Sequence, residues 1–547
     1  MKQPASRPQL FSAPATIAIA LTTVLPVADV ATSAEACVTV YRKGVITLPF
    51  NPAFLHVAAF PTAKGKDSRD ALLMSSFFNV ERDDAGDKVT RVFERDLAAW
   101  IPDLPALNPA TFDPRTDVEI LTDRAGEPFR HVWPNESDRV PDGVVPFEAV
   151  VVPGGFLATP RPGRITLVNL DDPKRGEYVV VESGTGIPDC TAGKTADKIK
   201  NDHWFYHYAL FHDMDGDGLK DLITARASLM PFKYQCPPVG ELVYFRNPGA
   251  AIQANVPWEV RVLVGLPLET SGPEVNMALA DLDSDGVPEI IASHFFNSDH
   301  ITVFGAPAGG QWKDVDPVRR PIRRKTIMTG QGRPFAVEPD DLNGDGRLEI
   351  LTSNHQGDGC FDVTRDAIPG RVIALEQPAS GRLFDDDWTT HVLKDNIRPN
   401  PTFPKPVRGP GRLAPNRAIA FWPERRLETR TKPWIVVGGD EASRVWVLRP
   451  LSEKKDDWRY ESVTIFDIND RYGPNTTQTL AREPKGEVIS TIGGLAWRYD
   501  RPGNDGKAEL YIPVFEARQI HIFSFREGKR ADRVACTRDA ALPCPGS

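Results

Sequence analysis

The stretch Asp213-Met-Asp-Gly-Asp-Gly-Leu-Lys-Asp221, which runs directly into the apolar segment Leu222–Ala225, decides the fold of this 547-residue chain. Two further copies follow: Asp281-Leu-Asp-Ser-Asp-Gly-Val-Pro-Glu289 and Asp341-Leu-Asn-Gly-Asp-Gly-Arg-Leu-Glu349, each again followed by an apolar run. Recurrence of one pattern at a similar spacing is the sequence signature of a repeat architecture. The three loops therefore predict a fold built from repeated units.

The spacing within each loop suits a hard cation. Oxygen-bearing side chains stand at positions 1, 3, 5 and 9, and a Gly that permits a tight turn stands at position 6. Without a cation, the four carboxylates of each of the first two loops would repel one another; the third loop has three carboxylates and Asn343. We therefore expect a structural Ca²⁺ in each loop, about three sites in total.

An EF-hand begins with the same pattern, but it needs Glu at position 12 and flanking helices. Position 12 is Thr224, Ala292 or Thr352 here, inside a β-type apolar run. The loops are therefore predicted to be turns between two strands. An Asp/Gly-rich turn without an ion remains the simpler alternative.

Apolar strands surround each loop in a regular order. One short strand precedes the loop and three follow it, and the loops recur at about sixty to seventy residues, which is typical of a β-propeller blade of four antiparallel strands. Weaker copies upstream and downstream complete an all-β ring of seven blades, with six or eight as alternatives. The expected blades span roughly 45–100, 112–185, 200–268, 270–330, 332–396, 405–470 and 485–530.

The first two blades give the weakest signal. Their expected strands are Leu55–Ala59, Ala71–Phe77, Val89–Phe93, Phe147–Val152, Arg164–Val168 and Tyr178–Val181.

Composition fits a fold of short strands and many turns, since the chain contains 50 Pro and 42 Gly. The formal net charge is −9, and nothing in the charge pattern indicates a nucleic-acid partner. The basic run Arg319–Lys325 is either a patch for an anionic ligand or a solvated surface.

The N-terminus has the features of a secretory signal peptide. Lys2 and Arg7 precede the apolar segment Ala15–Val30, and small residues follow it. Pro26 and Asp29 interrupt the apolar segment, so no membrane span is expected. The predicted division is a signal peptide at 1–36, a single propeller domain at 37–530 and a C-terminal tail at 531–547 of a secreted, extracellular protein.

Secretion accounts for an even number of cysteines, which allows up to three disulfides. The six are Cys37, Cys190, Cys236, Cys360, Cys536 and Cys544. Cys536 and Cys544 are separated by a short loop in the tail, and Cys190 and Cys236 bracket one repeat; these are the two expected pairs. No thiolate spacing indicates zinc. Two sequons, at Asn135 and Asn475, predict glycosylation in surface loops if the source is a eukaryote.

The loop and the strand after it resemble the FG-GAP or VCBS repeat, known from the propeller of integrin α chains and from many secreted proteins. The resemblance is specific at 213–221, 281–289 and 341–349 and partial at 504–509. It implies one Ca²⁺ per intact loop at the rim of the propeller. The side-chain ligands it implies are Asp213, Asp215, Asp217, Asp221, Asp281, Asp283, Asp285, Glu289, Asp341, Asn343, Asp345 and Glu349, with the backbone carbonyls of Leu219, Val287 and Arg347.

Catalytic motifs are absent: the chain has no Gly-X-Ser-X-Gly elbow, His-Glu-X-X-His helix or phosphate-binding Gly loop. Alignment of the blades on their loops places His207, Asn276, Arg333 and Arg417 at or near one position, before the first strand of each blade. It places His294 and His355 just after the second strands of their blades, and we expect these polar residues to converge near one end of the central channel. The candidate ligand-binding residues among them are His207, His294, Arg333, His355 and Arg417. The alternative is that they line a hydrated channel without binding anything.

Two classes of function follow. In the first, the protein is a binding module for a carbohydrate or an extracellular protein. In the second, it is a sugar-active lyase or hydrolase that uses channel His and Arg residues. Fungal aldos-2-ulose dehydratase is similar in carrying a propeller with calcium-type loops, although its cupin-like domains have no room in this chain.

Overall fold

Strands make up almost all of the regular structure in the computed structural model. The described residues are 40–61, 68–77, 81–82, 88–89, 96–122, 131, 133–155, 163–183, 204–228, 239–265, 272–295, 298–357, 368–400, 413–428, 431–468, 490–500 and 506–525. All six cysteines, Asn475, residues 1–36 and the tail at 531–547 lie outside them, so the predictions for those parts remain predictions.

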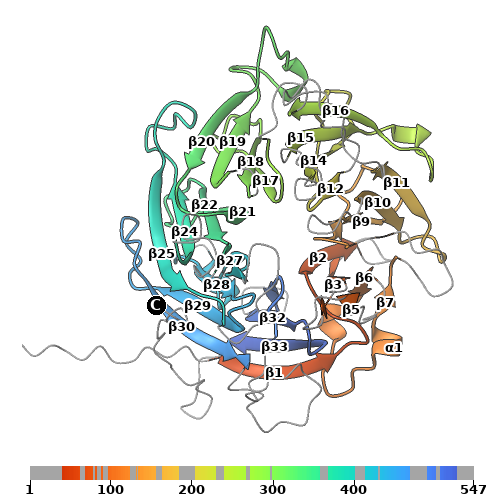
Figure 1. Ribbon diagram of the computed structural model, residues 1–547, viewed down its shortest axis with the longest axis vertical. Coiled ribbons are helices and arrows are strands. Elements are labelled where there is room, and N and C mark those ends of the chain that lie inside the picture. The colour runs from red at the N-terminus through yellow and green to blue at the C-terminus, as the bar shows by residue number, and fades with distance from the viewer. Residues whose placement is uncertain are drawn as a thin grey trace, which may run out of the picture. The chain divides into compact units, whose positions relative to one another are not determined.

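Seven antiparallel sheets, each four strands across, form a propeller in residues 37–547, as the sequence predicts (Figure 1). The first three sheets, from the inner strand outward, are β2 (Leu55–Pro61), β3 (Ser68–Ser76), β6 (Leu97–Ile101) and β7 (Glu119–Ile120); β8 (Asp138–Arg139), β9 (Ala149–Pro153), β10 (Arg164–Asn169) and β11 (Glu177–Glu182); and β12 (Phe205–Tyr206) with β13 (Leu210–His212), β14 (Asp221–Ser228), β15 (Val239–Arg246) and β16 (Glu259–Val264).

The next three sheets are β17 (Met277–Ala280), β18 (Glu289–His294), β19 (His300–Gly305) and β20 (Arg323–Met328); β21 (Pro334–Asp340), β22 (Glu349–Asn354), β24 (Gly370–Glu376) and β25 (Thr389–Ile397); and β27 (Ala418–Phe421), β28 (Trp434–Gly438), β29 (Arg444–Pro450) and β30 (Tyr460–Asp467). The seventh contains β31 (Ala496–Tyr499), β32 (Ala508–Val514), β33 (Gln519–Phe525) and β1 (Val40–Thr47).

Two short ribbons and a few helical turns lie between the sheets. They are β4 (Glu81–Arg82) with β5 (Lys88–Val89), β23 (Gln356–Gly357) with β26 (Leu413–Ala414), the helix α1 (Pro114–Asp117), and 3-10 turns at Leu104–Ala106, Gly249–Ala251, Trp312–Asp314 and Arg425–Leu427. None of the helices in the described part of the chain has the length and apolar character needed to cross a membrane.

The seventh sheet joins the two ends of the propeller chain. Strand β1 pairs antiparallel with β33, from Val40 opposite Phe525 to Thr47 opposite Gln519, so the N-terminal strand is the outer strand of the last blade (Figure 1). A ring closed in this way leaves only short, protected sheet edges.

This closure corrects the expected start of the first blade at residue 45. The first blade begins at β2, and residues 40–47 belong to the seventh. Its third strand is β6 (Leu97–Ile101), all five residues of which are buried, whereas Lys88–Val89 pairs with β4 in a separate ribbon. The second blade also has an inner strand, β8, that the apolar pattern does not reveal, because neither of its residues is apolar.

The hydrophobic core lies between neighbouring sheets. One cluster, for example, joins Val151 and Leu167 of the second sheet to Leu222, Val243 and Phe245 of the third. The middle strands are therefore covered on both faces, and every residue of β18 and of β22 is buried. This burial explains why the run after each acidic loop is continuously apolar instead of alternating.

The sequon at Asn135 does not lie in a surface loop. Its side chain is 1% exposed, and Nδ2 donates hydrogen bonds to the carbonyls of Gly155 (3.1 Å) and Tyr206 (2.8 Å). These contacts hold Asn135 inside the fold, where it is not accessible to a glycosylating enzyme.

Candidate functional site

The three acidic loops connect the first and second strands of the third, fourth and fifth sheets, as predicted. In each loop the carboxylate at position 1 accepts a hydrogen bond from the backbone N–H at position 6, at 2.9 Å for Asp213 and 3.0 Å for Asp281 and Asp341. Gly at position 6 has positive φ in all three loops, for example 85° at Gly286. The backbone is therefore bent around the carboxylates in the same way three times.

The donor sets of the first two loops fit a hard cation. Oxygens of Asp213, Asp215 and Asp221 lie within 4.8 Å of one another, and so do those of a second set of three, Asp281, Asp283 and Asp285. Burial, with nearby carboxylates adding to it, raises the pKa of Asp221 to about 6 and the pKa of Glu289 to about 7. A divalent cation would offset this repulsion.

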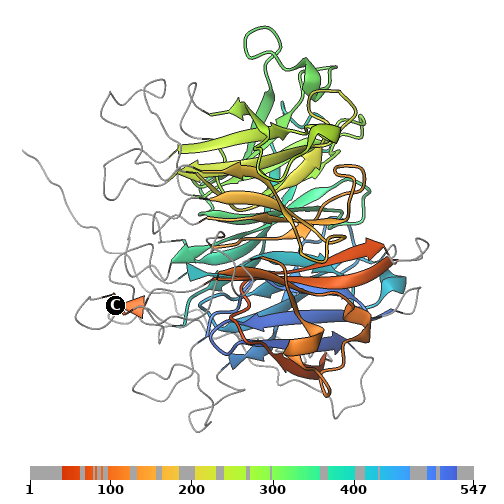
Figure 2. The same ribbon diagram turned by 90° about the vertical axis from the view of Figure 1, so that its right-hand side faces the viewer.

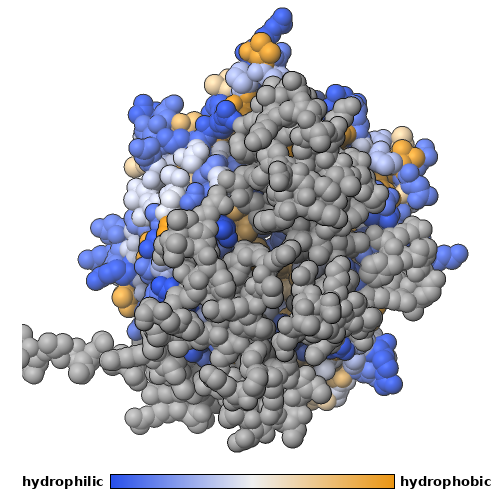
Figure 3. All heavy atoms as spheres, viewed as in Figure 1, coloured by the Kyte–Doolittle hydropathy of each residue, from blue (hydrophilic) through white to orange (hydrophobic). Residues whose placement is uncertain are grey.

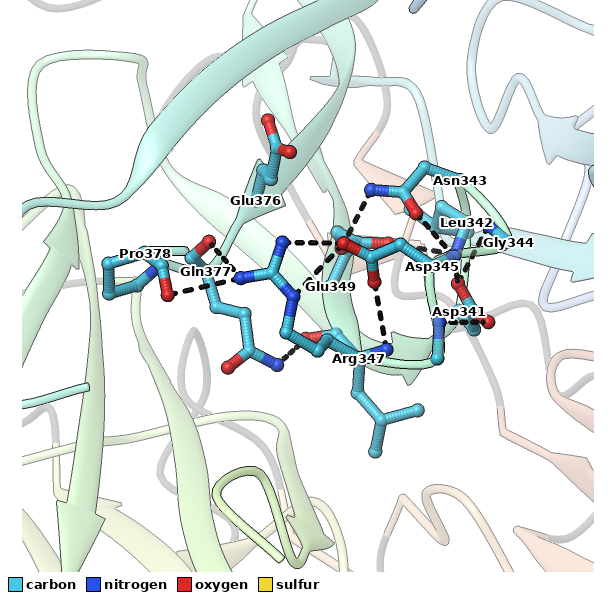
Figure 4. A network of polar contacts seen from close by, with 12 residues as sticks. Asp341, Leu342, Asn343, Gly344, Asp345, Arg347, Glu349, Glu376, Gln377 and Pro378 are labelled. Carbon is cyan, nitrogen blue, oxygen red and sulfur yellow. Dashed lines mark hydrogen bonds and ion pairs between the residues drawn. The ribbon is translucent and has the colours of Figure 1, made fainter. Parts of the chain in front are cut away.

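The third loop carries a positive charge of its own (Figure 4). The Arg347 Nε donates to Asp345 Oδ2 (3.0 Å), and its NH1 donates to the Pro378 carbonyl (3.1 Å). The Asn343 amide donates to Glu349 Oε1 (3.2 Å). Arginines also approach the other two loops: Arg246 Nε lies 2.5 Å from Asp215 Oδ2, and Arg323 NH2 lies 3.9 Å from Glu289 Oε1. The third loop differs from them in that the amide of Asn343 replaces a carboxylate and is turned to Glu349.

A second group of charged residues lies on the inner strands, around the centre of the ring. His56 Nε2 of β2 lies 3.1 Å from Asp138 Oδ1 of β8, and both side chains are 34% exposed. Burial alone would lower the pKa of His56, but the ion pair and hydrogen bond with Asp138 outweigh it and raise the pKa above 6.5. The contact with Asp138 therefore favours the charged form of His56.

Arg417, immediately before β27, connects three sheets. Its NH1 donates to Glu136 Oε2 (2.9 Å) beside the second sheet, and its Nε donates to Glu338 Oε1 (2.5 Å) on β21. Burial raises the pKa of Glu136, and the neighbouring Glu338 and Asp138 add to this effect. One guanidinium thus neutralises two carboxylates from different blades.

Aromatic rings gather where the chain enters the inner strands. Phe77 stacks on Trp133 with ring centroids 4.0 Å apart, and Phe54 lies edge-on to His207 at 5.5 Å. His207 contacts Phe335 at 5.9 Å. We call the set Phe54, Phe77, Trp133, His207, Phe295, Phe335, His355 and Phe515 the aromatic cluster.

His355 links the aromatic cluster to buried carboxyl groups. Its Nδ1 lies 2.8 Å from the Pro415 carbonyl and must donate to it, so the lone pair of Nε2 faces Asp440 Oδ2 at 3.5 Å. Burial, with Glu441 and Glu516 nearby, raises the pKa of Asp440, and burial lowers the pKa of His355 to about 4. A protonated Asp440 facing a neutral His355 satisfies both groups.

Four of the five predicted ligand-binding residues lie in or beside these central groups. His207 and His355 are in the aromatic cluster, the Arg333 carbonyl accepts from the His355 N–H (2.8 Å), and Arg417 is in the charged group. His294 is not among them: it is opposite His300 in the next strand, with ring centroids 4.0 Å apart. Side chains alternate along the chain, so its neighbour Phe295 contacts Phe335 instead.

Sequence reasoning missed His56, Glu136, Asp138 and Glu338. All stand on or next to inner strands, and the strand pattern places Glu338 directly after the expected strand Phe335–Val337. A search for charged residues at the inner strand of every blade would have found Glu338, but β8, which carries Asp138, is too short to be recognised.

Replacing His207 by Phe is expected to weaken the pH dependence of stability. Burial lowers the pKa of His207 from 6.5 to about 4, so between these pH values the unfolded chain binds more protons than the fold. The stability that depends on neutral His207 is complete above pH 6.5 and is lost as pH falls toward 4. Urea unfolding measures how far the free energy of unfolding falls between pH 7 and pH 4.5. This fall should be about 1–3 kcal/mol smaller in His207→Phe than in the wild type. Equal losses in both proteins would contradict the assignment.

One comparison with known proteins bears on the repeat itself. A family model described as an FG-GAP-like repeat matches residues 281–352, which include the second and third acidic loops. Curated protein sequences gave no match. Among solved structures, a glucose dehydrogenase is similar at 14% identity and a TM-score of 0.33, covering 72% of this chain and 96% of that one. An auxiliary nutrient binding protein from Bacteroides thetaiotaomicron VPI-5482 is similar at 9% identity and a TM-score of 0.34, covering 88% and 100%.

Proposed function

Since the chain is a seven-bladed β-propeller that carries an FG-GAP-like repeat, we propose that it is a secreted, calcium-stabilised module that binds a carbohydrate at the aromatic cluster of its ring. The observation that carries the proposal is the convergence of aromatic rings and charged groups from different blades. Aromatic faces stack on the apolar faces of sugar rings, and a few fixed polar groups select the hydroxyl pattern.

The charges beside the aromatic cluster favour a polyhydroxyl ligand over a strongly charged one. His56 and Arg417 are basic groups, and each is held by carboxylates at 3.1 Å or less. An incoming anion would have to compete with these carboxylates, whereas a hydroxyl group can both donate to and accept from them.

The test is a glycan array probed with the full-length protein before and after EDTA. We expect binding to a group of related glycans, and weaker binding after EDTA because the blades that carry the calcium loops also carry Phe295, Phe335 and His207. A protein that retains no glycan in calcium-containing buffer would contradict the proposal.

Calcium removal is also expected to lower the melting temperature. A ligand present at 100 times its Kd stabilises the fold by about 2.7 kcal/mol per site, and the first two loops have the better donor sets. Differential scanning calorimetry of the protein in EDTA and of the protein in excess CaCl₂ measures the difference in melting temperature. Equal melting temperatures in both buffers would show that the loops are turns without an ion.

A sugar-active lyase or hydrolase is the second candidate, because one observation favours proton transfer. His355 Nε2 and Asp440 Oδ2 are 3.5 Å apart at the aromatic cluster, and an imidazole beside a carboxyl group is a pair of the type that acts as general acid and base. Turnover on the glycans retained by the array, lost in Asp440→Asn and not in His294→Ala, would distinguish an enzyme from a binding module.

A further inference from the structure

One cavity lies away from the aromatic cluster, between the first and second sheets. This groove has a volume of about 610 Å³, within the range of small-ligand sites. Phe60 at its wall lies near the end of β2, whereas Phe54 of the aromatic cluster precedes the same strand. Six residues of extended chain separate the two by about 20 Å, so the groove is a separate place on the molecule.

The floor of the groove is apolar and fixed. Phe60 and Trp100 meet edge to face with centroids 5.2 Å apart, and both are buried. The Trp100 indole N–H donates to Glu119 Oε2 (3.1 Å). Phe147, which is only half-buried, packs on Tyr178 at 4.7 Å and gives the groove an accessible aromatic face.

The rim of the groove carries charges of both signs. Arg175 is held by Glu119 through Nε (2.6 Å) and NH2 (2.9 Å). Asp142 and Asp171 are exposed on the rim, and exposed Arg69 has no ion-pair partner among the residues that the structure describes. Glu148 also lines the groove, so three acidic side chains face two basic ones and the rim offers both donors and acceptors.

We propose that this groove is a second ligand site, and that it takes a neutral saccharide. A sugar ring presents an apolar C–H face to Phe147 and hydroxyl groups to the rim, and each hydroxyl both donates and accepts. A ligand with a strong net charge of either sign would meet repulsion from part of this rim. The inference stands on the groove alone and does not need the site at the aromatic cluster.

Isothermal titration calorimetry with neutral tetrasaccharides of glucose, xylose and mannose tests the proposal, with tetragalacturonate as the charged comparison. We expect at least one neutral probe to bind, and its affinity to fall about tenfold in Phe147→Ala and in Arg69→Ala. Arg319→Ala, a change at another exposed arginine, should leave this binding unchanged.

Arg69 is exposed, so Arg69→Ala keeps the test valid if Phe147→Ala folds poorly. The proposal is overturned if no neutral probe binds at about 10 mM, above the Kd of weak ligands, or if tetragalacturonate binds more tightly than every neutral probe. Loss of binding in Phe335→Ala with unchanged binding in both groove variants would also overturn it, while supporting the site at the aromatic cluster.

Discussion

Replacing Arg417 by Met is expected to destabilise the protein by about 3–5 kcal/mol, because it leaves two carboxylates without their counter-charge. Arg417 is 17% exposed and donates to Glu136 at 2.9 Å and to Glu338 at 2.5 Å. Glu136 is only 9% exposed, so water cannot replace the guanidinium fully. Chemical denaturation of wild type and Arg417→Met measures the loss.

A compensated variant separates the charge from the packing. Adding Glu136→Gln and Glu338→Gln to Arg417→Met removes the unpaired charges while keeping the side-chain volumes close, and more than half of the lost stability should return. Arg319→Met, at an exposed position, should change stability by less than about 0.5 kcal/mol. If Arg417→Met left the free energy of unfolding almost unchanged, Glu136 and Glu338 would not depend on the guanidinium for their stability in the fold.

Replacing Ile46 by Asp is expected to open the ring at its closing sheet. Ile46 of β1 is 1% exposed and lies opposite Ile520 of β33, in a core cluster that also contains Leu72 and Tyr511. A carboxylate at this position costs several kcal/mol, because a charge is buried and the apolar packing of the isoleucine side chain is removed. We expect a fall in stability of about 3 kcal/mol or more and faster amide exchange throughout β33.

The adjacent residue gives a matched control. Thr47 lies in the same strand but is exposed, so Thr47→Asp should change stability by less than about 0.5 kcal/mol and leave exchange in β33 unchanged. If Ile46→Asp left the protection of β33 as it is in the wild type, β1 would not close the ring.

Much of the fold could be predicted because the acidic loops mark the same point in successive blades. The apolar runs after Asp221, Glu289 and Glu349 give the second strands directly. The weaker copies predict seven blades, although they leave six or eight as alternatives. The pairing of β1 with β33 could not be predicted in this way, because it joins residues at opposite ends of the chain. Strand β8 was missed since the polar pair Asp138–Arg139 gives no apolar signal.

The site could be predicted only in part. Alignment on the loops placed His207, Arg333, His355 and Arg417 in or beside the central groups, because equivalent positions in successive blades face the same centre. The same alignment failed for His294 by one residue, where strand alternation directs Phe295 to Phe335 instead. The partners Glu136 and Asp138 depend on contacts across the ring, which no local pattern reveals.

Surface features add little to the choice of ligand, since the face in Figure 3 shows mainly hydrophilic residues with scattered hydrophobic ones among the residues that are coloured. Large exposed apolar side chains in the described part of the chain are few, and Val318 at 89% is the most exposed. Seen from the side, the strands run across the thickness of the propeller (Figure 2), and seen along the ring their inner strands surround a common centre (Figure 1). The inner strands therefore remain the place to look for the ligand of the aromatic cluster.

Titration of the glycan that the array retains most strongly, against wild type, Phe335→Ala and Phe384→Ala, tests the central claim most directly. Phe335 is in the aromatic cluster, whereas Phe384 is a half-buried ring under Arg323, at 4.2 Å from its guanidinium carbon. We predict a Kd about tenfold higher for Phe335→Ala and an unchanged Kd for Phe384→Ala. An unchanged Kd for Phe335→Ala would contradict carbohydrate binding at the aromatic cluster.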